Sequence, residues 1–224
     1  MTTAVIPVDG TQLTLGGTIS GGTIGVRIYG GAGTVTNAGT ISGASNAVLL
    51  ATGYANRAIV NAGGVFVGKV DGGNTLGATA VSTLELASSA SAGTLASLGS
   101  QFTHFANITV DSGATWTLTA DSIGAGYTIV DSGTLTNTGS IGSAITMGSG
   151  AQLTNAATGT IASAGTATVL YGTTLGSATV VNAGVIVNTN TAGIGIELDG
   201  GGIVTNQAGG RISAVGSEIG RAHV

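Results

Sequence analysis

The chain has 224 residues, of which 42 are Gly, one is Pro and none is Cys, and only 6% are charged. Hydrophobic residues make up 42%, which excludes a charged disordered segment, because such segments lack the apolar surface that offsets the entropy of ordering. The net charge is −4 and the Lys and Arg residues are scattered singly, which argues against nucleic-acid binding. Without Cys, disulfides and Cys-ligated zinc are impossible.

The chain starts with MTTAVIPVDGTQ, which has neither a basic region nor an apolar core, so no secretory signal is recognisable. No apolar run further along approaches the roughly 20 residues of a membrane-spanning helix. We therefore expect no transmembrane segment in this chain, and we expect the apolar residues in buried strands.

One phrase recurs along the chain: Asn or Asp, then Gly within a few residues, then an apolar residue. It reads GTVTNAGTISG at 33–43, and LTNAATGTIAS, VVNAGVIV and IVTNQAGGRIS follow later. If the longest gap hides one divergent repeat, the period is roughly 20 to 27 residues, the range of a solenoid rung. The predicted structural turn positions are Asn37, Gly39, Asn61, Gly63, Asp111, Gly113, Asp131, Gly133, Asn137, Gly139, Asn155, Asn182, Gly184, Asn206 and Gly209.

Between these positions the sequence alternates between apolar residues and Thr, as in residues 34–36, 115–119 and 133–136. Alternation over four to six residues, bounded by Gly, Asn and Ser, predicts short β-strands. The exception is SAGTLASL at 91–98, for which we expect one helical turn. The residues expected in the interior include Val35, Ile41, Leu135, Ile141, Val181 and Ile186.

Asn and Asp tolerate left-handed backbone angles and bond their own turn backbone, and Gly supplies other positive φ angles. In a coil of stacked rungs such corners lie about 4.8 Å apart, so that Asn side chains can bond along the axis. The predicted fold is therefore all-β, a single-stranded right-handed parallel β-helix over residues 1–217. Neither terminus has the sequence of a cap, so we expect a fragment of a longer protein.

Few residues could carry chemistry. GGVFVGKV at 63–70 nearly matches a phosphate-binding loop but lacks the terminal Ser or Thr and alternates as a strand. Glu197 and Asp199 lie two apart and could act as acid and base or bind calcium, but the favoured interpretation is a solvated strand end beside a Gly turn. His104 has no Cys and no second His nearby, so we predict no catalytic residue, no metal site and no cofactor.

Two further patterns have more than one interpretation. Phe102, Phe105 and Trp116 are expected to fill the widest core layer rather than to stack on sugars or bases. Thr-x-Thr occurs at 34–36, 115–119 and 134–136, and a regular Thr array could bind ice, but the spacing along the sequence is irregular. Ice binding therefore enters only as an alternative function.

The segments GTVTNAGTISG and VVNAGVIV, and above all STLELASSASAGTLASLGSQFTHFANITVDSGATWTLT at 82–119, resemble the passenger regions of autotransporters (type V secretion) and related bacterial β-solenoid adhesins. The resemblance covers most of residues 12–215. It implies a cell-surface, outer-membrane-anchored or secreted adhesin or stalk, with an unknown glycan or protein ligand and an outer-membrane barrel elsewhere in the full-length chain. The alternative from a different class is a fragment of a β-helix polysaccharide lyase or hydrolase.

The last residues, EIGRAHV at 218–224, break the repeat. IGRAHV looks like one reading frame of a sequencing adapter, so we expect residues 218–224 to be a non-native tail.

Overall fold

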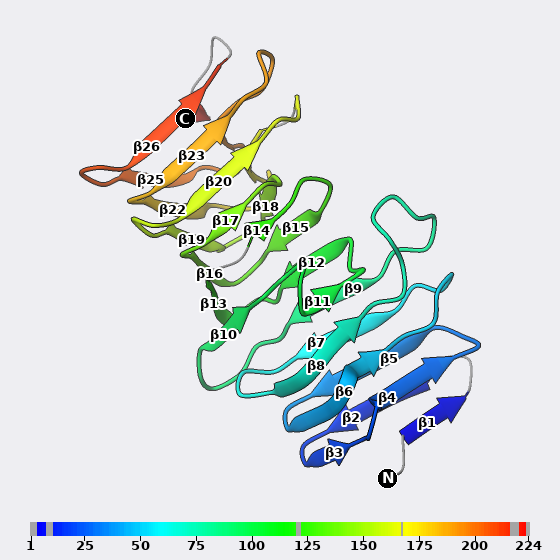
Figure 1. The fold of residues 1–224 in the computed structure, drawn as a ribbon. Coiled ribbons are helices and arrows are strands. Elements are labelled where there is room, and N and C mark those ends of the chain that lie inside the picture. The colour runs from blue at the N-terminus through cyan, green and yellow to red at the C-terminus, as the bar shows by residue number, and fades with distance from the viewer. Residues whose placement is uncertain (1–3, 8–10, 120–121, 167, 216–219, 223–224) are drawn as a thin grey trace. The chain divides into compact units, whose positions relative to one another are not determined.

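The computed structural model describes residues 4–7, 11–119, 122–166, 168–215 and 220–222 (Figure 1). The regular structure of these residues is entirely β, and the paired strands run parallel. The strands stack as a β-solenoid of about nine turns, counted over the described residues. The predicted all-β parallel β-helix is thus confirmed, and its right-handed coiling stays a prediction.

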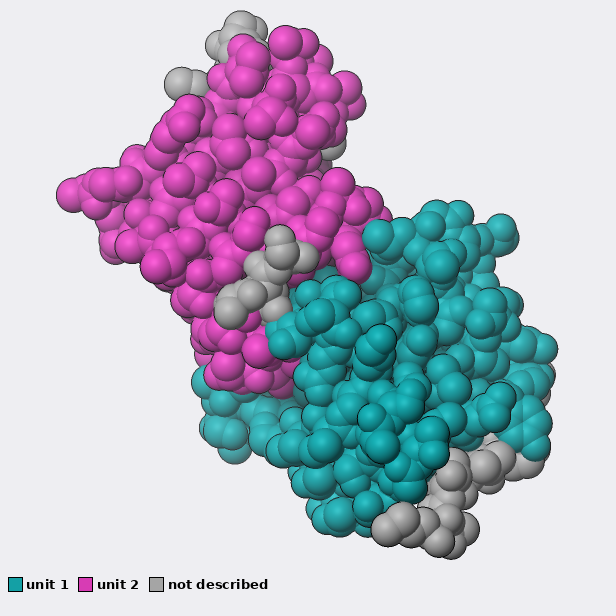
Figure 2. Space-filling view, in the orientation of Figure 1, with its two compact units in different colours: residues 1–93, 97–108 teal, residues 94–96, 109–224 magenta. Residues whose placement is uncertain are grey.

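The chain divides into two compact units, which Figure 2 colours separately. Unit 1 holds residues 1–93 and 97–108, and unit 2 holds residues 94–96 and 109–224. The sequence predicted one solenoid domain over residues 1–217. Each unit is itself built from parallel rungs, so the division separates two stretches of similar architecture.

In unit 1 two ladders of parallel strands alternate along the chain. The first ladder contains β1 (Ala4–Pro7), β4 (Ile24–Tyr29), β6 (Thr40–Leu49), β8 (Val65–Asp71) and β11 (Phe102–Thr103), with β3 (Thr18–Ser20) also paired to β6. The second ladder contains β2 (Thr11–Leu15), β5 (Gly33–Asn37), β7 (Arg57–Val60) and β9 (Thr83–Leu86). β12 (Asn107–Val110) begins in unit 1 and ends in unit 2.

In unit 2 three ladders recur in each rung. The first contains β15 (Thr128–Asp131), β18 (Ile145–Met147), β21 (Leu170–Gly172), β24 (Ile196–Leu198) and β27 (Gly220–Ala222). The second contains β10 (Gly93–Ala96), β13 (Thr115–Thr119), β16 (Thr134–Asn137), β19 (Gln152–Asn155), β22 (Ala178–Asn182) and β25 (Gly202–Asn206). The third contains β14 (Ser122–Ile123), β17 (Ser140–Ile141), β20 (Thr160–Ser163), β23 (Val185–Asn188) and β26 (Arg211–Ala214).

The interior is a thin stack of aliphatic side chains. In the second ladder of unit 2, Leu135, Leu153 and Val180 lie in register on successive strands and are almost fully buried. Each such side chain contributes about 1.5 to 3 kcal/mol to the free energy of unfolding. Of the predicted interior residues, Val35, Ile41, Leu135, Ile141 and Ile186 are buried.

The prediction for Val181 was wrong. Val181 lies on the outer face and is half-buried, whereas its neighbour Val180 is fully buried. The phase is set by Asn182, which points inward at the end of the same strand. Because side chains alternate along a strand, Val180 must then point inward as well.

The predicted helical turn at 91–98 was also wrong, because Gly93–Ala96 forms strand β10. Leu95 is buried, while Thr94 and Ala96 on either side are exposed, which is the alternation of a strand. Pairing to a neighbouring rung satisfies the backbone of this segment, and such tertiary pairing overrides a weak local helical preference.

Some rungs are shorter than the predicted period of roughly 20 to 27 residues. Along the corner of the second ladder, Asn137, Asn155 and Asn182 are separated by 18 and then 27 residues. A still shorter step pairs Ile129 with Ile145, 16 residues later. The loops therefore absorb the variation in length while the strands stay in register.

The predicted non-native tail is described only in part. Residues 218, 219, 223 and 224 lie outside the described residues. Residues 220–222 form β27, which pairs in parallel with β24.

Candidate functional site

The corner at the end of the second ladder in unit 2 holds a column of four Asn side chains. Asn137, Asn155 and Asn182 are buried, and Asn206 at the end of the column is exposed. The Nδ2 of each of the first three donates to the Oδ1 of the Asn one rung further along, at 2.9, 2.8 and 2.8 Å. The stacking of Asn side chains that the sequence predicted is therefore observed here.

The same Asn side chains also close the turns between the ladders. The Nδ2 of Asn155 lies 3.2 Å from the carbonyl oxygen of Gly159 and 3.1 Å from that of Val185. Asn137 makes matching contacts with Gly139 and Thr160. Buried amides are thereby satisfied by their own turn and by the next rung, so this column is a structural element.

Asn and Asp at the predicted turn positions have a second role. Their side-chain oxygen accepts a hydrogen bond from the backbone N–H two residues later, which closes a local ring. The N–H of Gly39 donates to Asn37 Oδ1 at 3.0 Å, and the N–H of Gly133 donates to Asp131 Oδ1 at the same distance. Gly139 and Asn137 repeat this arrangement at 3.1 Å. These are Asx turns, in which Asn and Asp mimic a backbone turn.

The remaining predicted positions lie in turns outside the Asn column. Gly184 lies two residues after Asn182, between β22 and β23, in close contact with the turn of the preceding rung. Other turns carry a positive φ, at Gly63 after Asn61, at Gly113 after Asp111 and at Gly209 after Asn206. Asn61 itself is half-exposed, and Val60 occupies the inward position in register with Asn37.

Asp131 differs from its Asn counterparts because it is a buried acid. Its Oδ1 is bonded to Gly133, but its buried Oδ2 has no hydrogen-bond partner among the described residues. Burial raises the pKa of Asp131 from 3.8 to about 7, and the hydrogen bond from the Gly133 N–H lowers it by less. The folded protein therefore binds this proton more tightly than the unfolded chain does.

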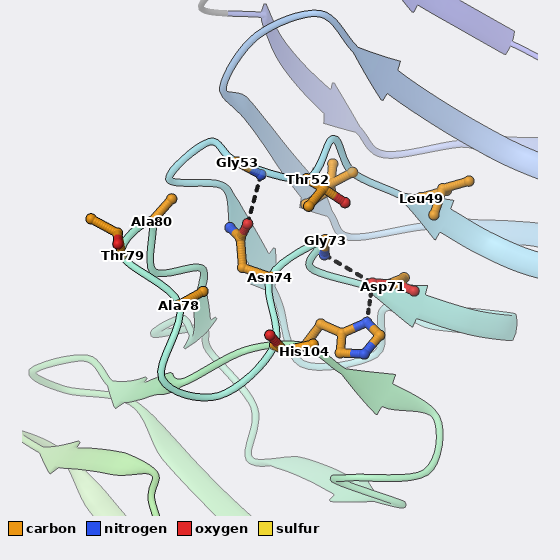
Figure 3. A pocket seen from close by; sticks show the side chains of 12 residues that line it. Leu49, Thr52, Gly53, Asp71, Gly73, Asn74, Ala78, Thr79, Ala80 and His104 are labelled. Atoms are coloured by element: carbon orange, nitrogen blue, oxygen red, sulfur yellow. Dashed lines mark hydrogen bonds and ion pairs between the residues drawn. The ribbon is translucent and has the colours of Figure 1, made fainter.

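Unit 1 carries a hollow of about 700 Å³ on its surface, lined by residues within 49–53 and 71–80 and by His104 (Figure 3). We call it the Asp71–His104 hollow. Its walls come from the ends of β6 and β8 and from the loops that follow them, so three successive rungs contribute. Its size is that of a small-molecule or sugar site.

An acid and an imidazole meet at the edge of this hollow. Figure 3 shows the side chains of Asp71 and His104 pointing toward each other, with Nδ1 of the ring 2.7 Å from Asp71 Oδ1. A ring N–H at Nδ1 can donate to the carboxylate at this distance, and the ring has a second nitrogen, Nε2, for a further hydrogen bond. The His104 side chain is 44% exposed.

His104 adopts a backbone angle of φ = 62°, in the left-handed region that β-strand and helix residues avoid. In the described chain only Ser97 shares such an angle among residues other than Gly. Such strain costs about 1 to 3 kcal/mol and persists where the surroundings fix it, often at functional sites. The bond to Asp71 is one of the contacts that fix the ring.

The walls of the hollow are held by amides that the sequence analysis missed. Asn74 Nδ2 donates to Tyr54 O and to Ser82 Oγ, and its Oδ1 accepts from the N–H of Gly53. Asn56 bonds Ala51 in the same wall. The bonds from Asn74 to Gly53 and Tyr54 join loops of successive rungs, so only the sequence DGGN at 71–74, a turn signal, could have drawn attention to this segment.

Unit 2 carries a second hollow of about 410 Å³, which we call the Glu197 hollow. Glu197 Oε2 accepts from the hydroxyl of Thr168 at 2.8 Å, and Asp199 Oδ2 accepts from the hydroxyl of Tyr171 at 2.9 Å. The hydrogen bond to Asp199 raises the pKa of Tyr171, and the charge of Asp199 adds to this. Each carboxylate thus has its own hydroxyl partner.

The other candidate residues have structural positions. Phe102, Phe105 and Trp116 are buried, as predicted, and Phe102 packs edge-to-face on Phe66 at a centroid distance of 5.5 Å. The phosphate-loop candidate at 63–70 is largely strand β8, where such a loop would need the start of a helix.

Comparisons with models of protein families, with curated proteins and with solved structures gave no match for this chain. Within the described ranges, no three His, Cys, Asp or Glu side chains gather closely enough to hold a metal ion. The described residues also contain no helix of the length and apolarity needed to cross a membrane.

Proposed function

We propose that this chain is a non-enzymatic β-solenoid displayed at a bacterial surface, outer-membrane-anchored or secreted, and that it acts as an adhesin on its own stalk. The supporting observation is that the interior of the solenoid and its loops have separate roles. Aliphatic side chains and the Asn column fill the interior, so the loops can vary without disturbing the scaffold. The resemblance of 82–119 to autotransporter passengers points the same way.

The Asp71–His104 hollow is the part of the scaffold best suited to a ligand. It is lined by a carboxylate, an exposed imidazole and Thr hydroxyls, together with the apolar residues Leu49 and Leu50. Short polar groups over apolar carbon match the alternating hydroxyl and C–H surfaces of a sugar. We therefore infer that a glycan, rather than a protein, is the ligand.

The test uses the full chain on a panel of immobilised glycans, with two variants of the hollow. Asp71→Asn removes the charge but keeps an acceptor for the Gly73 N–H. His104→Gly removes the imidazole at a backbone angle that Gly adopts freely. Asp199→Ala, which changes an acid of unit 2, is the matched control.

We expect the unmodified chain to bind a subset of the panel, both hollow variants to lose that binding, and the control to retain it. Absence of binding to any glycan, or equal binding by all variants, would contradict the proposal. Breakdown of an acidic glycan that depends on Glu197 would instead support the polysaccharide lyase or hydrolase alternative.

A further inference from the structure

The outer face of the second ladder in unit 2 is a regular array of Thr side chains. On β13 and β16 the outward pairs are Thr115 with Thr117 and Thr134 with Thr136, and the two pairs lie directly in register. These motifs are irregularly spaced along the sequence but regularly spaced in the structure, because loops of different lengths bring them onto neighbouring strands. Figure 1 shows β13, β16, β19, β22 and β25 one beside the next.

The register extends both columns over five strands. One column runs Thr115, Thr134, Gln152, Thr179 and Ile203. The other runs Thr117, Thr136, Thr154, Val181 and Thr205. Seven of these ten positions are Thr and none is charged. Val181 and Ile203 keep the β-branched shape, so Gln152 is the main departure.

The array has a two-dimensional repeat. Neighbouring strands lie about 4.8 Å apart, and outward residues along one strand lie about 6.6 Å apart, so the columns extend over about 19 Å. Thr is β-branched and stiff about χ1, which limits the entropy lost when its hydroxyl and methyl are fixed against a surface. The described hydrogen bonds include none donated by these seven hydroxyls to another described group.

The scaffold behind the face holds this repeat in place. Leu135, Leu153 and Val180 fill the inner side of the same strands, and the column of Asn137, Asn155, Asn182 and Asn206 locks their ends. An uncharged surface with repeating hydroxyls and methyls, backed by such a packed interior, can order water in a lattice. Charged groups would oppose this, because their own hydration shells are not ice-like.

We propose that the outer face formed by β13, β16, β19, β22 and β25 binds ice. The ligand is the crystal surface itself, whose water molecules are arranged in flat rows with repeats comparable to those of the Thr columns. This activity is separate from the proposed glycan binding, because it uses a different face, located within unit 2 alone.

The experiment measures the partition of the full chain into slowly growing ice, together with the shape and growth of single ice crystals. Thr136→Tyr places a bulky ring within the array, on its second strand, and Thr115→Tyr does the same at an exposed position on its first strand that tolerates a larger side chain. Thr160→Tyr is the matched control, since Thr160 is an outward residue of β20 in another ladder. Far-UV circular dichroism verifies the fold of each variant.

The unmodified chain and Thr160→Tyr should enter the ice and slow its growth, and Thr136→Tyr should lose both effects. If Thr136→Tyr fails to fold, the loss must appear in Thr115→Tyr. Exclusion of the unmodified chain from ice would overturn the proposal, as would equal loss in Thr160→Tyr. Binding to crystalline cellulose or chitin that depends on Thr136, without entry into ice, would assign the face to a polysaccharide surface instead.

Discussion

Substitution of Asn155 by Ala tests the Asn column at a fully buried position. Four contacts involve this side chain: one accepted from Asn137 and three donated, to Gly159, Asn182 and Val185. The amide has only two hydrogens, so the donated contacts amount to two full bonds. Three bonds at about 1 kcal/mol each, with a further penalty for partners left unsatisfied in the interior, predict a loss of roughly 2 to 4 kcal/mol.

Asn206→Ala is the matched control, because Asn206 is exposed and lies at the end of the same column. It accepts one bond from Asn182 and donates one to Gly210, and water can replace both, so we expect a loss of about 1 kcal/mol or less. Urea unfolding followed by the fluorescence of Trp116, the single Trp of the chain, reports on unit 2. Equal losses in the two variants would refute the idea that the buried column stabilises the rungs.

Two further predictions concern a buried acid and a tight turn. Because the folded state holds the proton of Asp131 more tightly, the contribution of Asp131 to the free energy of unfolding should be greatest below about pH 4 and fall as the pH rises toward its pKa of about 7. Asp131→Asn should abolish this fall, worth up to about 4 kcal/mol at pH 8, as measured by urea unfolding across the pH range. Gly39→Ala should lower the melting temperature markedly, since a Cβ there would clash with the carbonyl oxygen of Gly17. Gly16→Ala, where a Cβ meets no atom within 4 Å, should leave the melting temperature nearly unchanged.

The sequence was sufficient to predict the strands of a rung and the Asn positions at its corner. Alternation of Thr with aliphatic residues identified strands such as β13 and β16, and the recurring Asn identified the positions that stack. Val181 was misplaced because two Val residues are adjacent and the phase was not read from Asn182. That phase was available, since Asn182 and Val180 must share a face.

The surface features could not be read in the same way. The Asp71–His104 hollow joins loops from three rungs, and their juxtaposition depends on rung lengths that vary with the loops. The Thr columns depend on the same lengths. The chain between Thr115 and Thr134 passes through the other two ladders before it returns, and the length of its loops decides whether the two residues align. In a repeat protein whose loops vary in length, the sequence thus predicts the interior better than the surface.

Hydrogen exchange of the full chain carrying Ile41→Asp tests most directly whether each rung is stabilised mainly by the rungs next to it. Ile41 is fully buried and pairs with Ile19 on one side and Phe66 on the other. Solenoid contacts run to neighbouring rungs, so the damage should stay local. We expect faster exchange in the rungs around β6, and unchanged protection in the strands beyond Asn155. A uniform rise in exchange over the whole chain would show a single cooperative globule and contradict the rung-by-rung solenoid.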